Sequence, residues 1–297
     1  MLEQSETSYF SEPSASLDPR LFRDDKMQSS VRSAILQLLF NHLNQNYTGG
    51  EAWSRVWLAG SGVSYQWAAH RDPGDLDCLV VVDYRRFRES NNRYAGLSDK
   101  EIADMLNEGI RHELHPITTR FLDSFELTFY AITSPDITDI KPYAAYSLTD
   151  DDWTVAPEQK PLVVPMGWKN YSDSDRIQTI KVLTNYKNAK DKYEAASNEA
   201  IKANARSEMR MAMAQAVAMY EGIHSDRSNA FSATGEGYSD FANYRWQAGK
   251  QSGVIQGLRA IKDEMDAEDE ALQKSTYGVD LPDANTLIRR AATYRNH

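Results

Sequence analysis

Hydrophobic residues near the start of the chain recur at a helical spacing and then give way to a turn and a strand. Between residues 25 and 46 they recur every three or four positions, which predicts an amphipathic helix with Ser29 and Ser30 as candidate N-caps. The apolar positions of this helix are Val31, Ala34, Ile35, Leu38, Leu39 and Leu43. The sequence Tyr47-Thr48-Gly49-Gly50 predicts a turn, and a first strand is expected over about residues 55–59.

A second strand is predicted over residues 75–82, where side chains alternate between two faces. One face carries Asp75, Asp77, Leu79 and Val81, and the other carries Leu76, Cys78, Val80 and Val82. Because apolar residues occupy both faces beyond the two acids, we expect this strand to be buried on both sides.

The next part of the chain predicts one helix and a hairpin. The helix is expected over residues 98–112, with Ser98 as its N-cap and Glu101 in the capping-box position. Residues 116–122 and 125–132 are predicted to form two strands that turn around Asp123-Ser124.

A Pro- and Asp-rich segment follows from residue 134 to residue 168 and predicts a linker that wraps around the preceding domain. One short strand is expected within it, at residues 162–164. The acidic run Asp150-Asp151-Asp152 is predicted to be a solvated charge cluster rather than a metal site.

After residue 172 the hydrophobic pattern is helical throughout. Helices are predicted from about residue 177, over 197–222, over 241–272 and from 283 to the end, with a polar loop at 224–240. The sequence therefore predicts an α+β protein, with a small mixed β-sheet flanked by helices and a helical C-terminal domain. The predicted organisation is a polar arm at 1–24, the sheet domain at 25–150, a linker at 151–172 and the helical domain at 173–297.

Composition narrows the class of protein. The 297 residues are 41% hydrophobic and 10% aromatic, which is typical of a folded globular protein. No apolar run approaches the roughly 20 residues that span a bilayer, and the N-terminus lacks the features of a signal peptide. With Cys78 as the single cysteine, we expect no disulfides, no membrane partner and a cytoplasmic location. The formal net charge of −10 argues against a broadly basic nucleic-acid-binding surface, although it is compatible with a local basic groove.

Two acids at the entrance of the second strand are the first candidate chemistry. Asp75 and Asp77 are one residue apart, so their carboxylates point the same way from a strand. Two carboxylates on one face repel each other unless a cation lies between them. Mg²⁺ prefers oxygen ligands and often takes one or two protein carboxylates together with substrate phosphates, so these residues predict a Mg²⁺ site.

These acids follow a Gly60-Ser61 pair with thirteen residues between Ser61 and Asp75. That order, spacing and strand context resembles the signature of the DNA polymerase beta-like nucleotidyltransferase superfamily, which includes poly(A) polymerases, CCA-adding enzymes and minimal toxin-type nucleotidyltransferases. The resemblance covers about a third of the chain and implies a palm-like sheet domain. It also implies a third acid on a later strand. Glu126 is the candidate, with Asp123 and Asp136 as rivals.

The resemblance also assigns roles to these residues. Asp75, Asp77 and Glu126 are the implied catalytic residues and metal ligands in a two-metal mechanism that releases pyrophosphate, with two Mg²⁺ or alternatively Mn²⁺ ions. Asp75 and Asp77 would bind both ions, and Glu126 would complete the site of the ion that activates the nucleophile. Gly60 and Ser61 are the implied contacts to the triphosphate of an NTP such as ATP. The sequence departs from the family at Gly74, where serine is common, and in a long segment between the turn and the acids.

A fainter resemblance lies in the sequence RIQTIKVLTNYKNAK, which begins at Arg176. It is similar to a helix of poly(A) polymerase-like enzymes whose lysine reaches the triphosphate. Lys181 would take that role, with Lys187 nearby, and the alternative is that both are ordinary surface lysines. The loop residues Arg227, Gly235 and Gly237, with Arg245 after them, give only a weak phosphate signal. His70, His112 and His115 are expected to be structural or exposed, and His224 to lie at a helix end.

Three functional hypotheses follow. The first is an Mg²⁺-dependent nucleotidyltransferase that moves a nucleoside monophosphate from an NTP to RNA or a tRNA 3′ end, a nucleotide, a small molecule or a protein. The second is a nucleotide-sensing or antitoxin-like protein of the same fold that binds without catalysis. The third is a structural protein, which predicts that Glu126 lies far from the two aspartates.

Overall fold

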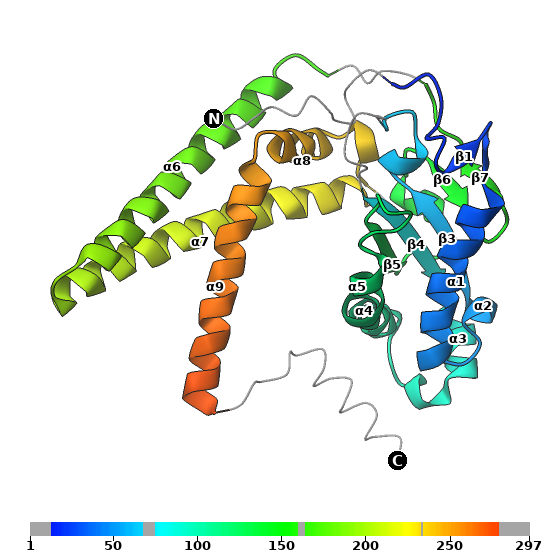
Figure 1. The fold of residues 1–297 in the computed structure, drawn as a ribbon, viewed down its shortest axis with the longest axis horizontal. Helices are drawn as coiled ribbons and strands as arrows, with labels where there is room; N and C mark the ends of the chain where they lie inside the picture. The colour runs from blue at the N-terminus through cyan, green and yellow to red at the C-terminus, as the bar shows by residue number, and fades with distance from the viewer. Residues whose placement is uncertain (1–12, 68–74, 160–163, 233, 279–297) are drawn as a thin grey trace. The chain divides into compact units, whose positions relative to one another are not determined.

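The computed structural model describes residues 13–67, 75–159, 164–232 and 234–278, and Figure 1 shows how they are arranged in helices and strands. These residues fall into two compact units, one before residue 160 and one after residue 163. The first contains every strand of the described chain, and the second is helical, so the predicted α+β class is confirmed. No helix within the described ranges combines the length and the apolar character that crossing a membrane requires.

The N-terminal unit is built around a five-stranded mixed sheet in the order β5-β4-β3-β6-β7. Strands β4 and β5 are parallel, and the other neighbouring pairs are antiparallel. Its strands are β3 (Ser54–Ala59), β4 (Leu76–Val82), β5 (Leu127–Ile132), β6 (Ala145–Ser147) and β7 (Asp152–Val155), and a separate hairpin pairs β1 (Phe22–Arg23) with β2 (Lys26–Met27). Its helices are α1 (Ser29–Asn46), α2 (Gly50–Trp53), α3 (Tyr84–Ser90), α4 (Asp99–Gly109) and α5 (His115–Thr118).

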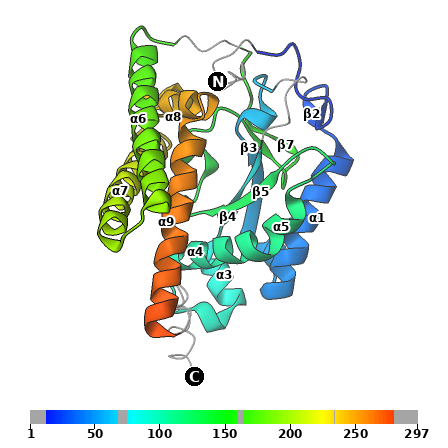
Figure 2. The same ribbon diagram turned by 60° about the vertical axis from the view of Figure 1, so that its left-hand side comes forward.

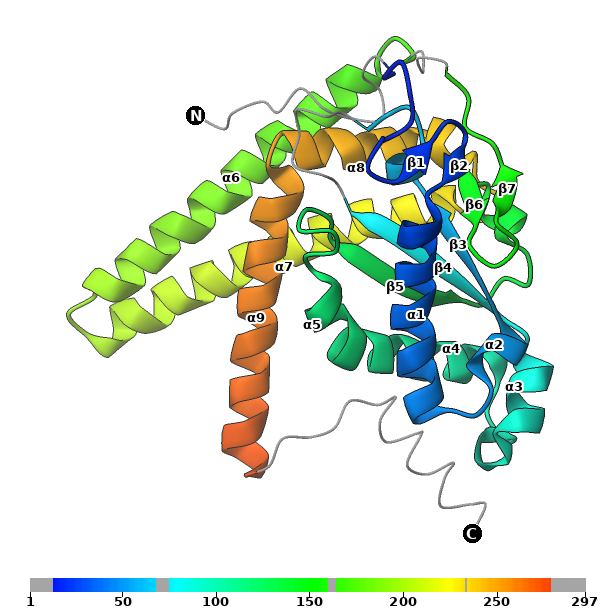
Figure 3. The same cartoon turned by 45° about the vertical axis from the view of Figure 1, so that its right-hand side comes forward.

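The two faces of the sheet bury two different clusters. Leu76, Cys78 and Val80 of β4 are almost completely buried against α1 and α4, in the main core, and Figure 3 shows α1 crossing this sheet. The opposite face carries a smaller cluster of Trp57, Ala59, Val81, Ile137 and Ala145. The prediction that β4 is buried on both faces beyond its acids is therefore confirmed.

The helices of this unit agree with the sequence pattern except at two places. Helix α4 begins with the predicted capping box between Ser98 and Glu101. Helix α1 begins at Ser29 after Gln28 with no side-chain cap, so the predicted capping role of Ser29 and Ser30 is wrong. The predicted strand at 116–122 is also wrong. Pro116 lies in the first turn of the short helix α5, where its missing N–H needs no partner.

The turn around Asp123 and the strand after it were predicted correctly. Leu122 and Asp123 adopt positive φ angles of 50° and 59°, and Phe121 forms an isolated antiparallel bridge with Phe125. Strand β5 follows within the predicted range 125–132.

The segment after residue 144 forms a hairpin between β6 and β7. Its turn holds Asp150 and Asp151 of the acidic run, and Asp152 begins β7. The Ser147 hydroxyl donates to Asp150 and the Tyr146 hydroxyl donates to Asp151, each over 2.9 Å. Strand β7 thus lies in the segment predicted to be a linker. The strand predicted at 162–164 falls at residues of which only Val164 is described, and Val164 is not in a strand.

In its described residues, the C-terminal unit contains four longer helices: α6 (Trp168–Ala195), α7 (Glu199–Ala230), α8 (Phe241–Gln251) and α9 (Val254–Tyr277). Figure 2 shows α6 and α7 side by side, and their shared core with α8 and α9 contains Val182, Met213, Trp246 and Leu258. Helix α7 continues to Ala230, so the loop predicted from residue 224 begins too early. The helix predicted over 241–272 is divided at Gly253, which has a φ of +76°. The helix predicted from residue 283 lies outside the described residues.

Strand β5 is an edge strand whose outer side is paired by a side chain. The Asn107 carboxamide of α4 accepts a hydrogen bond from the Ala131 N–H over 2.7 Å and donates one to the Ala131 carbonyl over 2.9 Å. The Thr118 hydroxyl donates to the Leu127 carbonyl over 2.7 Å. These contacts occupy backbone groups that would otherwise be open to pairing with another chain.

Replacing Asn107 with alanine should therefore destabilise the N-terminal unit by about 1–3 kcal/mol, because it leaves the Ala131 N–H and carbonyl without partners. Urea denaturation of N107A and of N92A provides the measurement, since Asn92 is exposed. Equal stability of the two variants would contradict this account of the edge.

A buried histidine links α1 to the π-helical turn Ile110–Leu114 that follows α4. His42 is 7% exposed, and its Nδ1 lies 3.5 Å from a carboxylate oxygen of Glu113. Burial lowers the pKa of His42, and the attraction of Glu113 opposes this only in part.

The stability of the protein should for this reason decrease as pH falls below the ordinary histidine range. As pH falls, the unfolded chain, in which the pKa of His42 is higher, takes up a proton at a higher pH than the folded chain does. The contribution of His42 to the free energy of unfolding is therefore complete above that range and is lost on acidification. Denaturation curves across pH 5–8 should show a shallower pH dependence for H42Q than for the wild type. A matching change in H112Q, at an exposed histidine, would refute the assignment to His42.

Candidate functional site

The predicted site lies at one end of the sheet in the N-terminal unit. Strand β3 ends there at Ala59, while β4 begins at Leu76 and β5 begins at Leu127, because β4 is antiparallel to β3 and parallel to β5. Asp77 pairs with Ala59 on one side and with Thr128 on the other. The register therefore brings the end of one strand and the acidic starts of two others together.

Gly60 makes the turn that leaves β3. Its φ of 88° and ψ of −157° lie in a region open essentially only to glycine. Its N–H donates to the Ala144 carbonyl over 3.3 Å. Ser61 then opens a short 3-10 turn, and its carbonyl accepts hydrogen bonds from the N–H and the hydroxyl of Ser64.

Gly62 fixes the position of this turn against β4. A Cβ atom at Gly62 would lie 2.6 Å from Cδ2 of Leu76, the residue between the two aspartates. The glycine therefore allows the turn to pack directly on the start of β4, where a Cβ at Gly62 would also lie 3.6 Å from the Asp75 carbonyl oxygen.

Asp75 and Asp77 are both exposed, whereas Leu76 and Cys78 are completely buried. The alternation of the strand thus directs the Asp77 side chain away from the main core, as predicted. Burial raises the pKa of the Cys78 thiol far above its usual range, with the Asp77 charge as a second cause. Cys78 is therefore an inert core residue rather than a nucleophile.

Glu126 lies beside these aspartates along the backbone. The Leu76 N–H donates to the Glu126 carbonyl over 2.8 Å, and the next residue, Leu127, pairs with Leu76. The Glu126 carboxylate, which is 48% exposed, lies 3.3 Å from Nε2 of His115 on α5. The other ring nitrogen of His115 is buried without a hydrogen bond.

The side chains of the three predicted acids do not form a common cage. Within residues 13–67, 75–159, 164–232 and 234–278, no three or more His, Cys, Asp or Glu side chains are arranged to hold a metal ion. His115, which was expected to be structural or exposed, is the neighbour that Glu126 contacts. No sequence signal identified this pair.

The two rival acids have local roles. Asp136 accepts hydrogen bonds from the N–H and the hydroxyl of Thr138, both over 2.8 Å, and these bonds lower its pKa. Asp123 occupies the positive-φ turn before Phe125. Of the candidates for the third acid, Glu126 is thus the one bonded through its backbone to β4.

The predicted nucleotide-binding lysines belong to the C-terminal unit. Lys181 and Lys187 are exposed on α6, and neither forms a hydrogen bond or ion pair with the described residues. Both are available for ligands, and both also fit the alternative of ordinary surface lysines.

The arginines near the predicted loop connect helices instead of facing a ligand. Arg245 forms two hydrogen bonds with Asp175, of 2.6 and 2.8 Å, and a third with Asp226 of 3.0 Å. The pKa of Arg245 is raised, first by the hydrogen bonds to Asp175. Arg227 stacks on Trp246 with its Cζ 5.0 Å from the ring centroid. His224 also packs on Trp246, within α7 rather than at its end.

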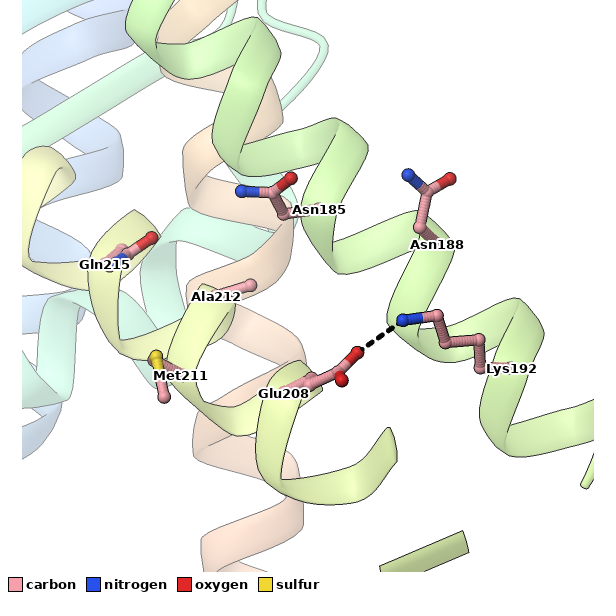
Figure 4. Close-up of a pocket in the computed structure, with 7 residues that line it drawn as sticks. All are labelled: Asn185, Asn188, Lys192, Glu208, Met211, Ala212 and Gln215. Atoms are coloured by element: carbon pink, nitrogen blue, oxygen red, sulfur yellow. Dashed lines mark hydrogen bonds and ion pairs between the residues drawn. The ribbon is translucent and has the colours of Figure 1, made fainter. Parts of the chain in front are cut away.

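A polar pocket of about 280 Å³ lies between α6 and α7 (Figure 4). An ion pair of 2.7 Å between Lys192 and Glu208 spans it. Its lining residues are Asn185, Asn188, Lys192, Glu208, Met211, Ala212 and Gln215. None of them was a sequence candidate, because exposed polar residues on a helix give no periodic signal.

Comparison with known proteins adds no relative to this picture. No family model matches the chain, and no curated protein and no solved structure matches it either.

A substitution in the Gly60 turn tests how the end of the sheet that carries the candidate site is built. G60A should lower the free energy of unfolding by about 1–3 kcal/mol, because alanine is strained at this φ and ψ. Denaturant unfolding monitors the change. G109A is the matched control, since Gly109 is helical with a φ of −59° and a Cβ there meets only ordinary contacts. A stable G60A together with a destabilised G109A would show that the turn carries no such constraint.

Proposed function

We propose that the protein is an Mg²⁺-dependent nucleotidyltransferase with a palm-like sheet domain. The observation that supports this proposal is the register of β4, which pairs Asp77 with both Ala59, next to the Gly60 turn, and Thr128, two residues after Glu126. The backbone segments that carry the three acids and the glycine turn thus meet at one end of one sheet. An NTP is the proposed nucleotidyl donor.

The donor groups at this end suit Mg²⁺ in chemistry. Asp75, Asp77 and Glu126 offer carboxylate oxygens, the ligands that Mg²⁺ prefers, and all three side chains are exposed. Glu126 has to leave His115 to join the aspartates. Both members of that pair are at least 31% exposed, and ion pairs in such surroundings contribute little, so exchange of the partner is inexpensive.

In the proposed reaction an acceptor hydroxyl attacks the α-phosphorus of the NTP, a new P–O bond forms, and the bond to pyrophosphate breaks. The hydroxyl proton passes to solvent. Bound Mg²⁺ would make the hydroxyl more acidic and neutralise charge on the departing pyrophosphate. Asp75 and Asp77 would hold the cation, with Glu126 completing its ligands, and the absence of a Cβ at Gly60 would let backbone come close to the phosphates.

The net charge of the chain is the basis on which we propose a class of acceptor. The chain carries a net charge of −10, which opposes association with a polyanion in the absence of a local basic surface. A small molecule, a nucleotide or a protein hydroxyl is consequently favoured as acceptor, with RNA or a tRNA 3′ end as the alternative that the family resemblance suggests. Lys181 and Lys187 of the C-terminal unit are the phosphate contacts that the fainter resemblance of α6 suggests.

A second candidate function is nucleotide binding without catalysis. The contact between Glu126 and His115 favours it, because a carboxylate held by a histidine does not contribute to a metal site. In that case nucleotide would bind and no pyrophosphate would be released.

The two functions differ in their response to loss of Asp77. D77N should reduce pyrophosphate release from labelled NTPs by at least about 100-fold with Mg²⁺ present, because one of the two strand carboxylates no longer carries charge. The assay should offer RNA, nucleotide, protein and small-molecule acceptors, and E89Q, at an exposed residue of α3, is the control for charge.

An inactive wild type that binds NTP as tightly as D77N does would support the sensor instead. An active D77N would contradict the assignment of the metal site itself.

A further inference from the structure

The chain before α1 packs against the segment that follows the glycine-serine turn. The N–H of Ser14 donates to the Tyr65 carbonyl over 2.6 Å, and the indole N–H of Trp67 donates to the Ser16 carbonyl over 2.6 Å. The Ser14 hydroxyl also donates to the Trp67 carbonyl. This strap, residues 13–20, was expected to be a loosely ordered polar arm, yet it is bonded to the end of the sheet where the predicted site lies.

The strap ends in a fixed arginine. Arg20 donates from Nε to both carboxylate oxygens of Asp18, over 2.9 and 3.1 Å, and from Nη2 to Oδ2 over 2.5 Å. The Asp18 side chain is 2% exposed, whereas that of Arg20 is 36% exposed. One edge of the guanidinium is therefore anchored to a buried carboxylate, and part of the group remains open to solvent.

Two aromatic rings lie beside this guanidinium. Its Cζ lies 4.6 Å from the ring centroid of Phe125 and 5.9 Å from that of Trp67. Phe125 directly precedes Glu126, and Trp67 belongs to the segment after Gly60-Ser61. Arg20 therefore lies between the two segments that supply the proposed phosphate contacts and the third acid.

The ion pair with Asp18 uses only one edge of the guanidinium. The Nη1 atom of Arg20 forms no hydrogen bond with any of the described residues. An arginine held at one edge and stacked on aromatic rings has lost its rotamer freedom in advance, which favours binding of an oxyanion at its other edge.

We propose that Arg20 is an anion-binding residue at the mouth of the site and that its Nη1 edge binds a phosphate group of a polyphosphate chain. The proposed ligand is the polyphosphate chain of a nucleotide, so the biological role of Arg20 rests on the proposed function. The anion site itself does not, because it requires neither metal nor turnover.

Titration calorimetry with inorganic tripolyphosphate in metal-free buffer tests the site directly. Arg20→Gln keeps a planar group that can stack on Phe125 and removes the charge. It should weaken binding about 10- to 100-fold, which is the usual loss for one charge-assisted hydrogen bond. Arg20→Lys, which keeps the charge without the fork, should recover part of the loss. Arg23→Gln is the matched control, because Arg23 is exposed on β1 and outside the contacts described above.

The thermal midpoint of each variant separates binding from folding. If the Arg20→Gln variant binds tripolyphosphate with the affinity of the wild type, whether or not its thermal midpoint is lower, Arg20 only holds the strap in place. A wild type that binds no tripolyphosphate would also overturn the proposal. ATP titrated in parallel should show the same dependence on Arg20, and loss of tripolyphosphate affinity alone would assign the site to an anion other than a nucleotide.

The same measurements distinguish this proposal from the proposed function. If tripolyphosphate binding depends on Arg20 while no acceptor is ever labelled, the anion site stands and the nucleotidyltransferase proposal fails. If nucleotide is transferred with unchanged KM and kcat in Arg20→Gln, the reaction stands and the role of Arg20 fails.

Discussion

The register of β4 between its two neighbours is the constraint on which the candidate site depends. Leu76, Cys78 and Val80 are buried because they face α1 and α4, and Asp77 stays in solvent because it alternates with them. A slip of one residue would exchange the two faces and bury a carboxylate, which is far more costly than the loss of a few contacts. The hydrophobic face of β4 thereby fixes the strand position of the acids, and the parallel pairing with β5 then fixes the backbone of Glu126.

The sequence predicted correctly those features that depend on interactions between residues close together in the chain. The faces of β4, the capping box of α4 and the helices of the C-terminal unit depend on neighbours within a few residues, so periodicity and caps indicated them. The strand predicted at 116–122 was wrong because a short apolar run is compatible with either period and Pro116 suits the first turn of α5. The division between α8 and α9 at Gly253 depends on one backbone angle, which a continuous helical pattern conceals.

The contacts that the sequence could not predict join distant segments at the site end. Glu126 contacts His115, and Arg20 stacks on Phe125, which is more than one hundred positions away in the chain. Neither contact follows from a regular spacing in the sequence, because each depends on how α5 and the strap pack near the ends of the strands. The sequence pattern placed all three acids on strands, whereas only Asp77 lies within one, and Asp75 and Glu126 each lie one residue before β4 and β5. The pattern said nothing of the groups that surround them.

These two contacts differ in how easily they exchange partners. Glu126 and His115 are 48% and 31% exposed, so water replaces much of what the pair gains, and a divalent cation or another acid can compete for Glu126. Asp18 is 2% exposed and would remain as an unpaired buried charge if Arg20 left it, which costs about 3–5 kcal/mol. This end of the sheet thus combines an acid, Glu126, that can change its partner with a cation, Arg20, that cannot. A charged group that keeps one position can hold an oxyanion in place, whereas a carboxylate with an exposed partner can adapt to more than one neighbour.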